Sequence, residues 1–157
     1  MNAVLRSRLL GMKITSSAIF TGLLLFCAST ICDARAFVEP SDEALFEKSD
    51  MVVVATPTET HDTAEHLANF CDFKGQSVIG VKTRFAVSAV QKGDPRTKEL
   101  TLYHYRPDKI SVPNGPMFVQ FEPAEKRVFR LYLIRLASGD FAPTAGQMDA
   151  ALSVKRQ

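Results

Sequence analysis

Two histidines and a carboxylate lie within six residues, which makes them the first candidates for chemistry in this chain. His61, Glu65 and His66 have side chains that bind zinc or transfer protons near neutral pH. Their spacing is H-x-x-x-E-H, whereas the helical zinc motifs are H-E-x-x-H and H-x-x-E-H. A zinc site would need a further ligand such as Cys71 or His104. We favour a polar loop here and keep the metal site of His61, Glu65 and His66 as the alternative.

A second candidate cluster combines aromatic and basic side chains. Tyr103, His104, Tyr105 and Arg106 are consecutive, and such residues stack on bases or sugars. On a strand the same residues alternate between two faces, so they can equally pack inward or cover a neighbouring element. We favour the packing role for these four residues and keep a binding site of Tyr103, His104, Tyr105 and Arg106 as the alternative.

Other catalytic patterns do not occur in the sequence. There is no G-x-S-x-G nucleophile elbow, and Gly75, Gly80 and Gly93 are too dispersed for a phosphate-binding loop. Gln147 and Asp149 are predicted to fix a turn through hydrogen bonds from side chain to backbone. We therefore predict no catalytic residue and no cofactor.

The first 36 residues have the organisation of a secretory signal peptide. A basic start extends to Lys13, an apolar run covers residues 19–28, and the small-residue motif A-R-A ends at Ala36. We predict cleavage after Ala36 and export to the periplasm or the medium, and we hypothesise that translation begins at Met12. The alternatives are an uncleaved membrane anchor and a lipoprotein.

Removal of residues 1–36 changes the net charge and the cysteine count, and both bear on which functional classes fit the mature chain. The remaining 121 residues hold 15 basic and 16 acidic side chains, a net charge of −1. Such a domain has no electrostatic footprint for nucleic acid, and no membrane association is expected after cleavage. Cys71 is then the one cysteine left, so an internal disulfide is excluded. We expect it to be a small packed residue.

The elements that must position these residues are mostly strands. One short helix is predicted over residues 40–48, capped by Ser41 or Asp42. Strands are predicted over residues 51–55, 78–90, 100–105 and 128–136, with shorter pieces at 141–143 and 152–154. Residues 61–75 and 106–127 are predicted as loops, in which only residues 117–121 could pair as a strand. Residues 37–157 therefore predict one mainly β domain, a small closed antiparallel OB-like barrel, with an immunoglobulin-like sandwich as the alternative.

Four stretches resemble a group of bacterial secreted domains. They are residues 44–55 (ALFEKSDMVVVA), 85–93 (FAVSAVQKG), 132–143 (YLIRLASGDFAP) and 146–154 (GQMDAALSV). The group is similar to netrin-module and tissue-inhibitor-of-metalloproteinase-like domains, and the resemblance implies an OB-type barrel. The animal inhibitors chelate zinc through an N-terminal cysteine, whereas this mature chain would begin at Phe37. The resemblance therefore implies no inhibitory residue here.

The function predicted from the sequence is that of an exported, non-catalytic binding module. Its partner is expected to be another protein, with a protease as the narrower hypothesis, bound through the loops at residues 61–75 and 106–127. Two alternatives remain, a metal-dependent hydrolase and a structural component of envelope assembly.

Overall fold

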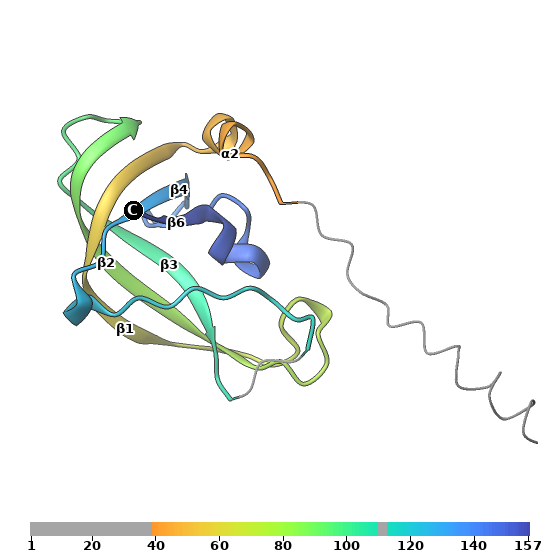
Figure 1. Cartoon of the computed structure of the whole chain (residues 1–157). Helices are drawn as coiled ribbons and strands as arrows, with labels where there is room; N and C mark the ends of the chain where they lie inside the picture. Colours follow the sequence, from red (N-terminus) through yellow and green to blue (C-terminus); the bar gives the residue numbers. More distant parts are fainter. Residues whose placement is uncertain (1–38, 110–112) are drawn as a thin grey trace, which may run out of the picture. The chain divides into compact units, whose positions relative to one another are not determined.

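The computed structural model describes residues 39–109 and 113–157, so the predicted signal peptide lies outside the described part of the chain. Its elements, with η for 3-10 turns, are α2 (Asp42–Lys48), β1 (Met51–Leu67), η1 (Phe70–Asp72), β2 (Val78–Lys92), β3 (Glu99–Pro107), η2 (Pro123–Glu125), β4 (Phe129–Arg135), β5 (Phe141–Pro143), η3 (Gln147–Ser153) and β6 (Val154–Arg156) (Figure 1). None of the described helices has the length and apolar character needed to cross a bilayer.

Five strands close a barrel in the order β1-β2-β3-β5-β4, because β4 also pairs with β1 (Figure 1). The short strand β6 pairs with β4 as well. The mainly β, OB-like barrel with one short helix is thereby confirmed. One pairing departs from the all-antiparallel expectation, since β3 and β5 run parallel where Leu102 meets Phe141.

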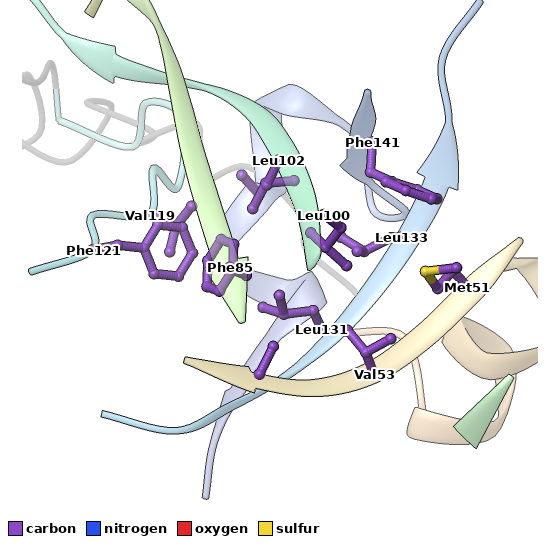
Figure 2. Close-up of a cluster of buried hydrophobic side chains, with 12 residues drawn as sticks. Met51, Val53, Phe85, Leu100, Leu102, Val119, Phe121, Leu131, Leu133 and Phe141 are labelled. Atoms are coloured by element: carbon purple, nitrogen blue, oxygen red, sulfur yellow. The ribbon is translucent and has the colours of Figure 1, made fainter. Parts of the chain in front are cut away.

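The barrel encloses a core built from the inward side chains of all five strands. Figure 2 shows this cluster, whose labelled members are Met51, Val53, Phe85, Leu100, Leu102, Val119, Phe121, Leu131, Leu133 and Phe141. Phe121 packs edge-on against both Phe85 and Phe129, with ring centroids 4.9 and 5.3 Å apart. Each such side chain stabilises the fold by roughly 1.5–3 kcal/mol relative to an exposed position.

The start of β1 is buried on both of its faces, as the run of β-branched residues predicts. Met51 and Val53 belong to the barrel core, whereas Val52 packs with Leu45 and Tyr132 beneath α2. The helix is capped as expected, since the Ser41 side chain accepts a hydrogen bond of 3.2 Å from the backbone of Ala44. The N-terminal helix thus covers the outer side of this strand.

Strand β1 is much longer than predicted, and the expected loop at residues 61–75 is wrong over its first half. β1 continues to Leu67 because it pairs with β2 as far as Val78. Register shifts between Pro57 and Glu59, and again between Asp62 and His66, let the strand bend and accommodate the proline. Beyond the barrel the strand has few core contacts, so its residues lack the apolar pattern that reveals a strand.

Two further expectations about the connecting segments are corrected. Residues 117–121 form no strand, although Val119 and Phe121 are buried in the core. The backbone of Met117 bonds instead to η3, donating to Met148 and accepting from Ala151. Cys71, expected to be a small packed residue, is exposed instead and lies in η1 with a φ of 50°.

Candidate functional site

Strands β1, β2 and β3 run on together past the short strands β4 and β6, which gives them two faces with different chemistry (Figure 1). Lys82 pairs with Tyr103 and Gly80 with Tyr105, and the side chains of Lys82 and of the two tyrosines point away from the barrel core. Val81 pairs with His104 on the opposite, inward face. The predicted cluster of Tyr103, His104, Tyr105 and Arg106 is therefore divided, with the tyrosines outside and His104 and Arg106 inside.

A groove of about 370 Å³ lies on the outer face. Three strands and the turn between β4 and β5 supply its lining, which includes Thr63, Glu65, Lys82, Tyr103, Leu136 and Asp140. We refer to it as the outer groove. Two residues of the predicted sites, Glu65 and Tyr103, meet here although 38 positions separate them in the sequence.

Glu65 holds both tyrosines of the outer face. Tyr105 donates its hydroxyl to Glu65 Oε1 at 2.9 Å, and Tyr103 donates to Oε2. The two rings meet edge-on, 5.5 Å apart, and Tyr105 packs on Phe70. Burial first, and then the Glu65 carboxylate, raises the pKa of Tyr103, and burial likewise raises that of Tyr105. Both hydroxyls therefore stay protonated and act as donors.

This contact crosses β2 because Gly80 has no side chain. A Cβ at Gly80 would collide with the Tyr103 hydroxyl and would lie 2.6 Å from Oγ1 of Thr63. The register shift between Asp62 and His66 bulges β1 at this same level. Gly80 and the bulge together let side chains of β1 and β3 meet over the strand that separates them.

The other end of the outer groove carries an ion pair. Lys82 Nζ lies 2.8 Å from Asp140 Oδ2, which joins β2 to the turn before β5. Gln147 donates to the Tyr103 carbonyl at 2.9 Å and so fixes β3 rather than the turn that was predicted for it. The groove thus offers an aromatic ring, one ammonium and the carboxylates of Glu65 and Asp140, an excess of negative charge.

The three predicted metal ligands are not assembled. His61 lies opposite Lys82, whereas His66 lies opposite Ile79 on the far side of the bulge. Glu65 is engaged by the two tyrosines. Across residues 39–109 and 113–157 no three side chains of His, Cys, Asp or Glu are grouped to hold a metal ion. The metal site therefore stays a prediction without a ligand set in the described residues.

The inward face forms a second hollow of about 240 Å³ at the end of the barrel, which we call the end cleft. Asp62 and Arg106 form a two-point ion pair there, and this pair holds the pKa of Asp62 below its ordinary value. His104 is 1 % exposed and its Nε2 lies 2.9 Å from Oγ1 of Thr83. Burial lowers the pKa of His104 to about 4, offset in part by the backbone of Tyr105.

Sequence reasoning missed three residues that shape the outer groove. Lys82 and Asp140 carry no motif, because their pairing depends on how β5 returns to the barrel. Gly80 did carry a signal, since a glycine inside a strand often marks a close approach of another chain segment.

The protein is therefore an OB-like barrel, and its outer groove lies on the outer face of strands β2 and β3. No protein-family model matches the chain, and no curated protein or solved structure matches it either.

Proposed function

We propose that the protein is an exported, non-catalytic binding module that takes its partner in the outer groove. The observation that carries this proposal is the position of the groove. Lys82 and Tyr103 belong to β2 and β3, and Asp140 belongs to the turn between β4 and β5. In OB-fold barrels, this face and the loop that follows the fourth strand are where ligands bind. The signal-like residues 1–36 support the exported location.

The chemistry of the groove favours a protein as the partner. Tyrosine is enriched at the centres of protein interfaces, where its ring supplies contact area and its hydroxyl a hydrogen bond. The two carboxylates of Glu65 and Asp140 outnumber the single ammonium of Lys82, which disfavours a phosphate backbone. A protease is the narrower form of this proposal, and it is supported by the resemblance to inhibitor-like domains alone.

Affinity capture tests the proposal with a matched pair of aromatic variants. The exported protein is immobilised as wild type, as Tyr103→Ala and as Phe46→Ala, with circular dichroism confirming that each is folded. Phe46 is a suitable control because it is 39 % exposed and lies on α2. A partner retained by the wild type and Phe46→Ala but lost by Tyr103→Ala supports the proposal. Equal retention by all three overturns the assignment to the outer groove.

The location of the captured partner separates a released module from an envelope component. Periplasmic extract and culture supernatant are passed separately over the same columns. A partner found in the envelope fraction alone would favour the role in envelope assembly.

A further inference from the structure

Every charged group that lines the outer groove already has a partner. Lys82 Nζ lies 2.8 Å from Asp140 Oδ2, and Glu65 accepts hydrogen bonds from the hydroxyls of Tyr103 and Tyr105. A charged side chain of a binding partner would have to break one of these contacts and lose its own hydration as well. The outer groove therefore disfavours a charged occupant, in spite of its excess of one carboxylate.

The rest of the groove wall is apolar and accessible. Tyr103 lines the groove from β3 and Leu136 lines it from the turn between β4 and β5, and both residues are partly exposed. Lys82 adds the methylenes of its side chain, because its ammonium is held at Asp140. Covering these surfaces with an apolar side chain would remove them from water and so favour binding.

Tyr103 is fixed from three directions in the unbound protein. Its hydroxyl donates to Glu65, its ring meets the Tyr105 ring edge-on at 5.5 Å, and its backbone carbonyl accepts from Gln147 at 2.9 Å. A side chain that is already held in one conformation loses little entropy when a partner packs on it. Aromatic pairs also gain more than their buried area alone, so this ring favours a second ring as its neighbour.

We propose that the partner protein inserts one uncharged aromatic side chain into the outer groove, where it packs against Tyr103 and Leu136. The volume of about 370 Å³ is near the lower limit for ligand pockets and suits a single large side chain. The residues that anchor protein interfaces are often aromatic side chains seated in such pockets. This inference deepens the proposed function and rests on it, because it takes the partner to be a protein.

Tryptophan fluorescence tests the inference, because the chain itself contains no tryptophan. A blocked Ala-Trp-Ala tripeptide is titrated with the exported protein, and its emission reports the ligand alone. The same tripeptide with Phe, Leu, Lys or Glu at its centre is then added as a competitor. We expect the Phe tripeptide to compete best, the Leu tripeptide roughly fivefold less well, and the Lys and Glu tripeptides at least about tenfold less well. Absence of binding, or competition by Leu, Lys or Glu as strong as that by Phe, would overturn the inference.

Two leucine variants locate the binding. Leu136→Ala removes part of the apolar wall, and we expect it to weaken the tryptophan tripeptide roughly fivefold. Leu67→Ala is the matched control, because Leu67 is 37 % exposed and does not line the groove. Equal effects of the two variants would place the tripeptide elsewhere and overturn the inference. If circular dichroism shows Leu136→Ala to be unfolded, Tyr103→Ala against Phe46→Ala makes the same comparison.

The outcome for the inference can be told apart from the outcome for the proposed function. If the tryptophan tripeptide fails to bind while immobilised Tyr103→Ala still loses the captured partner, the inference alone is overturned. If all the columns retain the partner equally, the assignment of the proposed function to the outer groove is overturned, whatever the tripeptides do.

Discussion

The hydroxyl of Tyr103 occupies the space that a Cβ of Gly80 would fill. This relationship links three strands, because the hydroxyl reaches across β2 from β3 and donates to Glu65 on β1. The outer groove therefore depends on a residue that contributes no side chain to it.

Replacing Gly80 with alanine should destabilise the fold and displace Tyr103. The added methyl has no room beside the hydroxyl of Tyr103 and Oγ1 of Thr63, and such overpacking costs typically 1–3 kcal/mol. Urea unfolding of Gly80→Ala, Tyr103→Phe and the double variant measures the effect. Removal of the hydroxyl relieves the main clash, so the double variant should lose less stability than the two single variants summed. Simple additivity would contradict the close contact.

Replacing Glu65 with glutamine should lower the pKa of the tyrosines in the outer groove. Burial is the largest cause that raises the folded-state pKa values of Tyr103 and Tyr105; the contact with Tyr103 comes next for Tyr105, and Glu65 raises the pKa of both. Loss of the carboxylate removes the contribution of Glu65 and leaves that of burial, so the pKa of both tyrosines should move down toward the ordinary value of about 10 without reaching it. Phenolate absorbance during alkaline titration, in a Tyr132→Phe background, reports these two residues alone.

The control for this titration is Glu59→Gln, a carboxylate on the same strand that pairs with Arg84. It should leave both tyrosine pKa values where they are. Equal shifts in the two glutamine variants would mean that general charge, rather than the Glu65 contact, raises them.

Acidification should destabilise the protein through His104. Its pKa is about 4 in the folded state and about 6.5 when unfolded, so between these values only the unfolded chain takes up the proton. Stability is therefore fully present above pH 6.5 and falls by about 3 kcal/mol in total as the pH drops to 4. Urea unfolding between pH 7 and pH 4 should show this loss, added to that of the carboxylates. In His104→Gln the loss should be smaller, whereas His61→Gln, at an exposed histidine, should resemble the wild type.

The sequence predicted the elements whose residues face a core and failed where they do not. The start of β1 and the helix capped by Ser41 have strong local signals, namely a buried β-branched run and a capping side chain. The second half of β1, from Thr58 to Leu67, is polar and almost entirely exposed, so only its pairing with β2 makes it a strand. Local propensity cannot report a pairing partner that lies outside the local sequence.

The candidate site was predictable in part for the same reason. Tyr103 and Glu65 were named from their chemistry, but in separate clusters, since nothing local shows that β1 and β3 flank β2. The alternation of β3 correctly separates Tyr103 from His104. The partner groups Lys82 and Asp140 depend on the closure of the barrel, which the parallel pairing of β3 and β5 completes.

Truncation of Phe121 should show that residues 113–122 are a structural part of the barrel. The ring is 4 % exposed and packs edge-on against Phe85, His104 and Phe129, so Phe121→Ala should cost about 3–5 kcal/mol. Phe46→Ala, at a ring that is 39 % exposed, should change stability by about 0.5 kcal/mol or less. Urea unfolding of both variants at pH 7 makes the comparison. If the two losses were similar, the segment before η2 would be a loosely attached loop, because only a ring fixed in the barrel core leaves a cavity when it is removed.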